Sequence, residues 1–253
     1  MDHRFNYAVL RETGHRPWRM PDSAWVMTQT WHDLLFAHWP VNPAALRDKV
    51  PAPFQLDLFE GQAWLGIVPF RMTNVAPRGV PPLPWISAFP ELNVRTYVRV
   101  GERPGIYFFS LDAARWLAVR AARTLLNLPY YQASMAVTPE GGRIHYESRR
   151  DDAHGSADFV GSYGPVGLPV TPPRGSLEYF VTERYCLYHV SRRGAPYRLE
   201  IHHPPWPLQT AAATLTRNSM AEVHGIALPD RLPLLHFARR QDMVAWPPVS
   251  LVP

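Results

Sequence analysis

Residues 91–100 of the chain, ELNVRTYVRV, carry its clearest secondary-structure signal. Apolar and polar side chains alternate along them, which is the period of a β-strand that has one face on a core. The apolar face would hold Leu92, Val94, Val98 and Val100, and the other face would hold Glu91, Asn93, Arg95, Tyr97 and Arg99. The stretch therefore predicts a strand with a buried apolar face and a polar second face.

Apolar stretches on both sides of this strand predict many further strands and few helices. Strands are predicted at 64–75 and 105–110, and again at 131–138, 143–150, 156–160, 184–192, 196–203, 207–215 and 232–246. One long helix is predicted over residues 111–126 with Ser110 as its N-cap, because Pro129 forbids further helix. Short helices are predicted at 44–50 and 176–182.

The composition favours one domain built from short strands. Proline accounts for 28 of the 253 residues, about twice its usual ~5%, and it lacks the backbone donor that helices and central strands need. We expect an α+β fold in which residues 29–253 form a single domain. Its core would be a large, mostly antiparallel sheet with one long helix packed against it. Residues 1–28 are polar and irregular, and we expect them to form an N-terminal arm.

Charge and cysteine content limit the partners. The net charge is +5 at pH 7, but the basic residues are scattered in pairs without interleaved aromatic residues, so we expect no nucleic-acid partner. The lone Cys186 excludes an intrachain disulfide, which fits a reducing compartment. No stretch approaches the ~18 apolar residues of a membrane span, and the first thirty residues hold no secretory apolar segment. We expect a cytoplasmic protein with no membrane partner.

Motifs of the common cofactor and metal enzymes are missing. The sequence has no phosphate loop, dinucleotide glycine motif, hydrolase serine elbow or His-Glu-x-x-His. His202 and His203 are adjacent on a predicted strand, so their side chains point to opposite faces and cannot hold one ion together. The glycines at 161, 164 and 167 are predicted to form a plain turn. We therefore predict no cofactor and no metal.

Trp206 lies among three prolines in the segment from His203 to Leu208. These prolines restrict the backbone and hold the tryptophan at little entropic cost. Two interpretations stay open for this residue. Trp206 would be either a rigid aromatic wall beside a pocket or a core residue at the entry to a strand.

Several segments together resemble the YqjF-like proteins, a bacterial family of unknown function also named domain of unknown function 2071. They are Leu56-x-x-Phe59-x-Gly61-x-Ala63-Trp64, Glu91 to Tyr97, Phe109-Ser110-Leu111-Asp112, Leu128-Pro129-Tyr130, His203 to Leu208 and Ala238-Arg239-Arg240. That family is grouped with the acetoacetate decarboxylase-like superfamily. The resemblance implies a β-rich cone or barrel that encloses a small polar cavity.

The resemblance also indicates which chemistry the chain lacks. In acetoacetate decarboxylase a lysine, activated by a neighbouring lysine, forms a Schiff base with the keto acid. The similar place here is Pro129-Tyr130-Tyr131, so two tyrosines stand where two lysines would be. The sole lysine, Lys49, lies far from any matching motif, and arginine cannot replace an amine nucleophile. We therefore expect no acetoacetate decarboxylase activity.

The hypothesis that follows is a small-molecule site inside the cone, for an anionic or carbonyl ligand. The candidate catalytic residues are Glu91, Tyr130 and Tyr131, and the candidate ligand-binding residues are Arg95, Tyr97, Ser110, His203 and Trp206. Since consecutive strand residues diverge, only one of the two tyrosines can face the cavity, and we expect it to be Tyr130.

Whether the protein is an enzyme stays open at this point. Catalysis would be lyase-like or hydratase-like and would use no covalent lysine. The alternatives are a non-catalytic ligand-binding protein and an oligomeric assembly protein, and homo-oligomer formation is left open in each case. The polar face of residues 91–99 would also fit a solvent-exposed surface with a weak ion pair between Glu91 and Arg95.

Overall fold

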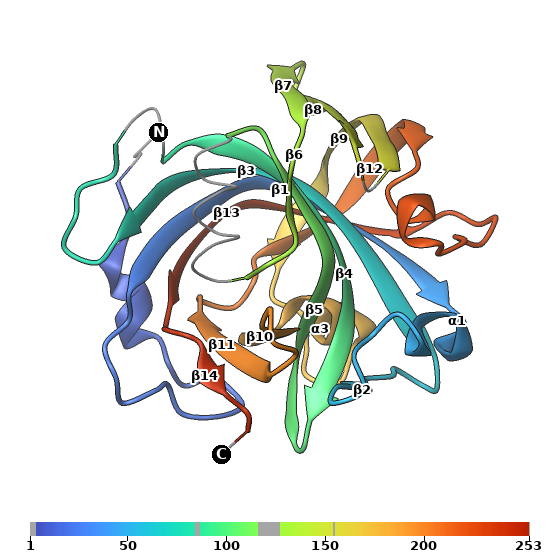
Figure 1. Cartoon of the computed structure of the whole chain (residues 1–253). Helices are drawn as coiled ribbons and strands as arrows, with labels where there is room; N and C mark the ends of the chain where they lie inside the picture. The colour runs from blue at the N-terminus through green and yellow to red at the C-terminus, as the bar shows by residue number, and fades with distance from the viewer. Residues whose placement is uncertain (1–3, 84–86, 116–126, 154, 253) are drawn as a thin grey trace.

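The alternating stretch found in the sequence is strand β4 (Phe89–Val100), which lies inside a large sheet (Figure 1). The structure is a computed structural model that describes residues 4–83, 87–115, 127–153 and 155–252. In these ranges the other strands of the sheet are β1 (Met27–Val41), β2 (Gln55–Leu56), β3 (Ala63–Pro77), β5 (Arg103–Ala113), β6 (Tyr130–Gln132), β7 (Ser134–Glu140), β8 (Arg143–Asp152), β9 (Gly155–Val170), β10 (Cys186–Val190), β11 (Pro196–His202), β12 (Leu208–Asn218), β13 (Leu234–Ala245) and β14 (Val249–Ser250). The helical segments are η1 (Tyr7–Arg11), α1 (Pro43–Arg47), α3 (Leu177–Thr182) and η2 (Glu222–His224).

Seven of the described strands close into a ring. Their order is β11, β10, β5, β4, β3, β1 and β13, and β11 pairs again with β13, which joins the two ends. Neighbouring ring strands are antiparallel except β10 and β5, which are parallel. Outside the ring order, β2 pairs with β4, and β6 adds to β5 in parallel. Closure directs one face of each ring strand toward a common interior.

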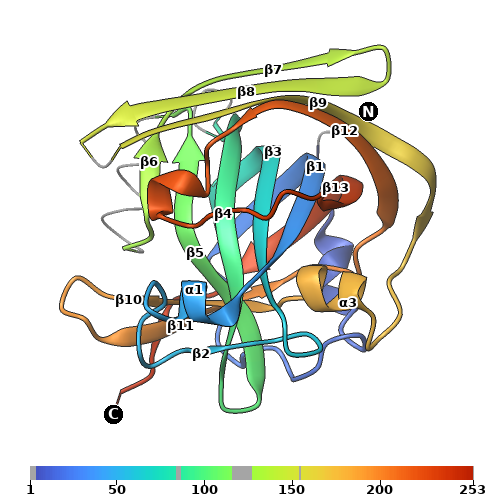
Figure 2. The ribbon, with the colours of Figure 1, turned by 90° about the vertical axis from the view of Figure 1, so that its right-hand side faces the viewer.

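A second layer lies across the outside of the ring. From β13 the sheet continues through β12, β9 and β8 to β7, and Figure 2 shows β7, β8 and β9 crossing one end of the ring strands. One apolar core fills the ring interior with side chains from all seven ring strands. A second core lies between the ring and the outer layer, where Leu92 and Val94 pack with Tyr146 and Phe159.

Both faces of β4 are therefore buried between Glu91 and Val98. Its apolar face packs against the outer layer, and its polar face is directed into the ring, where Glu91 is 3% and Arg95 7% exposed. The alternative of a solvent-exposed polar face, which the sequence left open, is excluded by this burial.

The start of the predicted long helix is wrong. Leu111 to Ala113 continue strand β5, where Ala113 pairs with Glu91 and Asp112 pairs with Leu92. Ser110 therefore lies within a strand and is not a helix cap. Pairing with β4 overrides the local helix signal here, as tertiary context commonly does. The rest of the predicted helix, residues 116–126, lies outside the described residues.

A bulge in β1 changes which side chains enter the ring. Asp33 has φ +52 and interrupts the pairing of β1 with β3 between His32 and Ala37. Before the bulge Met27, Gln29 and Trp31 line the ring interior, and after it Leu34 and Phe36 do so. One extra residue in a strand shifts its alternation by one position, which explains the change from odd to even residues.

Residues 4–26, which precede β1 and are called the N-terminal arm below, contact β11 and β13. The Arg16 guanidinium donates to the Ile201 carbonyl oxygen at 2.7 Å and to Glu200 at 3.1 Å, and His202 contacts the Val9 carbonyl oxygen at 2.9 Å. The amide of Val26 donates to the Ala245 carbonyl oxygen at 2.8 Å. The arm is thereby bonded to both strands that complete the ring.

The β-rich α+β class predicted from the sequence is confirmed, since a large, mostly antiparallel sheet with a closed ring organises the described chain. The division into an arm of residues 1–28 and one domain of residues 29–253 stays a prediction. Among the described residues, no helix combines the length and the apolar character needed to cross a membrane.

Candidate functional site

The ring interior contains a pocket with a volume of about 100 Å³. Apolar side chains provide most of its lining. Among the described lining residues only Met27, Gln29 and Trp31 are partly exposed, and all the others are buried. The pocket therefore opens beside the first half of β1. Its volume suits a few water molecules or one small organic molecule.

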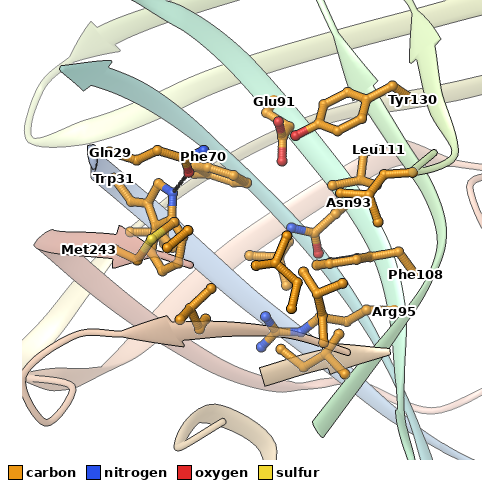
Figure 3. Close-up of a pocket in the computed structure, with 18 of the residues that line it drawn as sticks. Gln29, Trp31, Phe70, Glu91, Asn93, Arg95, Phe108, Leu111, Tyr130 and Met243 are labelled. Atoms are coloured by element: carbon orange, nitrogen blue, oxygen red, sulfur yellow. Dashed lines mark hydrogen bonds between the residues drawn. The ribbon is translucent and has the colours of Figure 1, made fainter. Parts of the chain in front are cut away.

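Strand β4 supplies the pocket with a line of polar groups. Glu91, Asn93 and Arg95 occupy alternate positions, and Figure 3 shows them following one another along β4. Within the described structure, Glu91 Oε2, Asn93 Oδ1 and Arg95 Nε are buried atoms without a hydrogen-bond partner. Buried polar atoms are nearly always paired with protein or ordered water. All three atoms belong to residues that line the same wall of the pocket.

The phenol of Tyr130 lies beside Glu91 at one end of this line (Figure 3) and influences the pKa of its carboxyl group. Figure 3 shows the Tyr130 hydroxyl directed toward the Glu91 carboxyl group. Burial raises the pKa of Glu91 to about 8; the phenol of Tyr130 lowers it and the nearby Asp112 raises it. The carboxyl group is therefore mostly protonated at neutral pH. In that state it can donate a proton or a hydrogen bond to a group in the pocket.

Arg95 provides positive charge at the opposite end. Its Nη2 donates to the Val181 carbonyl oxygen at 3.1 Å, and its guanidinium lies 5.3 Å from the centre of the Phe36 ring. Since Nε has no partner among the described residues, part of the guanidinium is available to a ligand. A guanidinium suits a carboxylate or a carbonyl oxygen because its donors are planar and permanently charged.

The two adjacent tyrosines lie on opposite faces of the wall. Tyr130 lines the pocket, whereas Tyr131 packs against Arg150, whose guanidinium lies 4.2 Å from the Tyr131 ring centre. Arg150 also forms a buried ion pair with Asp112 at 3.1 Å. Burial raises the pKa of Asp112 to about 7, although the charge of Arg150 lowers it. Two titratable groups, Glu91 and Asp112, thus lie on opposite faces of the same wall.

Trp206 forms another part of the pocket wall. Its ring stacks on Trp31 with centres 5.8 Å apart and meets Phe36 edge-on at 4.9 Å. Its backbone amide donates to Glu183 at 2.8 Å. His203 lies behind it, with ring centres 5.2 Å apart, and contacts the Pro204 carbonyl oxygen at 2.7 Å. Trp206 therefore meets the pocket, and His203 supports it from the core.

Tyr97 and Ser110 lie away from the pocket lining. Tyr97 is fully buried below Arg95, and its hydroxyl donates to the Val181 carbonyl oxygen at 2.7 Å. Ser110 faces the outer layer, where its hydroxyl lies 3.1 Å from His224 Nε2. Of the candidate site residues, the pocket lining contains Glu91, Arg95, Tyr130 and Trp206. Tyr97 and His203 do not line the pocket but contact residues that do. Tyr131 and Ser110 face away from it.

Asn93 and the residues of β1 were missed as site residues. Asn93 had a usable signal, because it lies between Glu91 and Arg95 on the same strand face. Gln29, Trp31 and Phe36 belong to a strand that the sequence analysis did not identify. Its signal is the apolar run Leu34 to Ala37, a pattern typical of a strand buried on both faces.

Lys49 does not line the pocket. It lies beside His224 and Gly225 on the outer side of the ring. The described residues also contain no cluster of three or more histidine, cysteine, aspartate or glutamate side chains arranged to hold a metal ion.

Comparisons with known proteins bear on both family and fold. The DUF2071 family model, described as an uncharacterized conserved protein, matches residues 28–242. The chain is 48% identical over 228 residues to the uncharacterized protein YqjF of Bacillus subtilis (strain 168), which covers 90% of this chain and 93% of that protein.

Solved structures are similar over most of the chain. Acetoacetate decarboxylase from Legionella pneumophila matches with a TM-score of 0.65 at 10% identity, covering 96% of this chain and 95% of that one. The enduracididine biosynthesis enzyme MppR, complexed with the condensation product of pyruvate and imidazole 4-carboxaldehyde, matches with a TM-score of 0.62 at 10% identity over 90% of both chains. At this identity the likeness concerns the fold alone. The chain belongs to the DUF2071 family, and its fold is that of acetoacetate decarboxylase-like proteins.

Proposed function

We propose that the ring pocket binds a small organic anion, such as a short carboxylate with a carbonyl group. The observation that supports it most directly is the line of Glu91, Asn93 and Arg95, each with a buried polar atom that lacks a partner in the described structure. Leaving a buried donor or acceptor unpaired costs about 1–3 kcal/mol. A ligand that pairs with these atoms recovers this free energy.

The charge of the lining argues for a monoanion. The ionisable lining residues in the described chain are Glu91, Arg95 and Tyr130. Glu91 and Tyr130 are neutral at pH 7, since burial raises the pKa of both groups, and arginine is charged. The lining thus carries about one positive charge in a mostly apolar space, and one negative charge on the ligand balances it.

Reaction chemistry in this pocket would use acid and base groups and no Schiff base. Lys49, the sole lysine, is outside the lining, so the chain would not act as an acetoacetate decarboxylase. Glu91 would protonate or hydrogen-bond a carbonyl oxygen, with Tyr130 holding the carboxyl group in place. Lyase-like or hydratase-like turnover fits these groups, and pure binding without turnover would use the same site. A related structure of MppR is described as complexed with pyruvate, which makes pyruvate a reasonable first probe.

In an assembly protein without a ligand, unpaired polar groups in the interior would only reduce stability. This disfavours the assembly alternative. We place this activity in the cytoplasm because the lone Cys186 fits a reducing compartment. Self-association of the chain would be compatible with the same pocket.

The experiment measures pyruvate binding by calorimetry for the wild type and two matched variants. Tyr130→Phe removes the phenol that contacts Glu91, and we expect it to weaken binding about tenfold. Tyr131→Phe removes the neighbouring phenol on the opposite face, and we expect affinity within about twofold of the wild type. Equal effects of the two substitutions, or a wild type that binds neither pyruvate nor acetate, would count against the site. Borohydride reduction with pyruvate present should add no mass to Lys49.

A further inference from the structure

A chain of buried hydrogen bonds lies below Arg95, behind the lining of the pocket. The Val181 carbonyl oxygen accepts from Arg95 Nη2 at 3.1 Å and from the Tyr97 hydroxyl at 2.7 Å. Val181 lies in the last turn of α3, where backbone carbonyls have no partner within the helix. This carbonyl is therefore free to hold the guanidinium and the phenol together.

The direction of the chain follows from counting protons. The Tyr97 hydroxyl has one hydrogen, which it donates to Val181, so its oxygen accepts the bond from His38 Nε2 at 2.6 Å. His38 is thereby fixed as the tautomer that carries its proton on Nε2, and Nδ1 has no partner among the described residues. Burial lowers the pKa of His38 well below its ordinary value, and the charge of Arg95 lowers it further.

Gly66 makes this arrangement possible. It lies on β3 between His38 of β1 and Arg95 of β4 in the pairing of the three strands. A Cβ atom at Gly66 would lie 2.9 Å from His38 Nε2 and 3.3 Å from Arg95 Cγ. The missing side chain leaves the space in which the His38 ring crosses β3 to reach Tyr97.

We infer that His38 and Tyr97 are positioning residues that fix the orientation of Arg95 through the Val181 carbonyl, and that Gly66 is required for their approach. This inference rests on the proposed function, because it assigns these residues to the anion-binding end of the same pocket. His38, Tyr97 and Gly66 do not line the pocket. Their role is to hold the guanidinium so that Nε stays directed away from the protein's own acceptors.

The first test is spectroscopic and needs no ligand. In the wild type we expect the long-range ¹H–¹⁵N spectrum of the His38 ring, assigned by its loss in His38→Gln, to show an unprotonated Nδ1. Tyr97→Phe should shift and broaden the Arg95 Nε–H signal, which is assigned by its loss in Arg95→Lys. Tyr163→Phe is the control, because it removes an equally buried hydroxyl that donates to the Asp33 carbonyl oxygen outside the pocket. It should leave the Arg95 signal unchanged.

The second test is pyruvate binding. We expect Tyr97→Phe and His38→Leu to weaken it about tenfold, whereas His38→Gln, which keeps an N–H donor, should stay within about threefold of the wild type. Gly66→Ala should behave like Tyr97→Phe, with Gly14→Ala as its control, since no atom lies within 4 Å of a Cβ built at Gly14.

The outcomes separate this inference from the proposed function. If the wild-type His38 ring carries its proton on Nδ1, or if Tyr97→Phe leaves the Arg95 signal unchanged, the positioning role is overturned even when pyruvate binds. If the Arg95 signal responds as expected but the wild type binds no small anion, the positioning role stands and the proposed function fails. The wild-type tautomer decides the matter if Tyr97→Phe does not fold.

Discussion

Glu91 shows at the scale of one residue how burial changes the chemistry of a carboxyl group. It is enclosed on a strand whose two faces are both covered, and its oxygen Oε2 has no partner in the described structure. An ionised carboxylate would be poorly solvated there, and burial accordingly raises its pKa to about 8. Glu91 is thus an acid at neutral pH and becomes a base only in alkaline solution.

This shift predicts how stability depends on pH. The folded-state pKa of about 8 lies above the ordinary value of 4.5, so the folded protein binds more protons than the unfolded chain between these values. The stabilisation from Glu91 is fully present below about pH 4.5 and is lost as the pH rises through about 8. Wild-type stability should fall relative to Glu91→Gln over this window, by at most ~1.4 kcal/mol per pH unit.

The measurement is urea unfolding of both proteins at pH values from 5 to 9. Asp112 changes in the same direction, because burial raises its pKa to about 7. It is present in both proteins, so most of its own contribution cancels in the difference between their unfolding free energies, which then reports mainly on Glu91. Parallel stability profiles of the two proteins would show that Glu91 is ionised in the folded state.

The sequence alone can assign two residues to the same face of a strand when the strand alternates regularly between them. Glu91 and Arg95 share a side of β4 because the strand period is two. Ser110, named from the sequence as a candidate ligand-binding residue, faces away from the pocket because the pairing register shifts between Val94 and Arg95, so that Ser110 opposes Val94 and Phe108 opposes Arg95. The extra residue turns Ser110 toward the outer layer, and a bulge of this kind leaves no mark in the alternation of a single strand.

At the scale of elements, the misjudged segments are those whose structure depends on distant partners. Strand β1 is buried on both faces over much of its length, so it has little alternation to recognise. The segment at 161–167 was predicted as a turn, but Gly161 and Gly164 lie within β9. A Cβ at Gly161 would come within 2.8 Å of Leu215 in β12. These glycines allow neighbouring strands to approach β9 closely. That role depends on residues far away in the sequence, so the pattern around the glycines does not reveal it.

The bulge at Asp33 gives a prediction about this element. Its positive φ disfavours side chains with a Cβ, and its carboxylate binds Arg71 and Arg239, each at 3.0 Å. Asp33→Ala and Asp33→Gly both remove the carboxylate, but only alanine keeps the backbone strain. Both variants should be less stable than the wild type, with the glycine variant about 1 kcal/mol more stable than the alanine variant.

Thermal unfolding of the three proteins checks this order. A glycine variant less stable than the alanine variant would show that the backbone at position 33 is not held in the left-handed region. The comparison is matched, because neither substitution introduces a new polar or bulky group.

At the scale of the whole molecule, the ring is least connected around β10 and β11. In the described chain β10 pairs with β5 at one position, Leu187 with Ile106, and β11 pairs with β13 at two. The N-terminal arm spans the second of these junctions, because Arg16 binds Ile201 and Glu200 of β11 while Val26 binds Ala245 of β13. Ile201 and Ala245 both line the pocket, so the arm supports its wall from outside.

Arg16 and Arg19 provide a matched test of this support. The Arg16 side chain is 1% exposed and bound to Glu200, whereas Arg19 is 94% exposed with only a distant contact to Asp22 at 4.0 Å. Arg16→Ala should destabilise the protein by about 1–3 kcal/mol, with Arg103 and Arg198 still neutralising Glu200. Arg19→Ala should change stability by less than about 0.5 kcal/mol.

Hydrogen exchange locates the effect. Amides of β11 and the end of β13 should exchange faster in Arg16→Ala than in the wild type, and those of β4 should be unaffected. Uniform acceleration over the whole sheet would mean that the arm contributes only to global stability. The sequence could not foresee this arrangement, since the arm shows no periodicity and its partners lie nearly two hundred residues away in the chain.

The pairing of β1 with β13 also determines when, during translation, β1 can complete its hydrogen bonds. Met27 is matched with Ala245, so the first long strand leaves the ribosome well before its partner is synthesised. Strand β3 can cover one edge of β1 early, but the other edge stays open until β13, which begins at Leu234, has been synthesised. Non-local pairing of this kind slows folding, and an uncovered strand edge is prone to aggregation. The synthesis of β13 therefore both completes the pocket wall and covers the edge of β1 that is prone to aggregation.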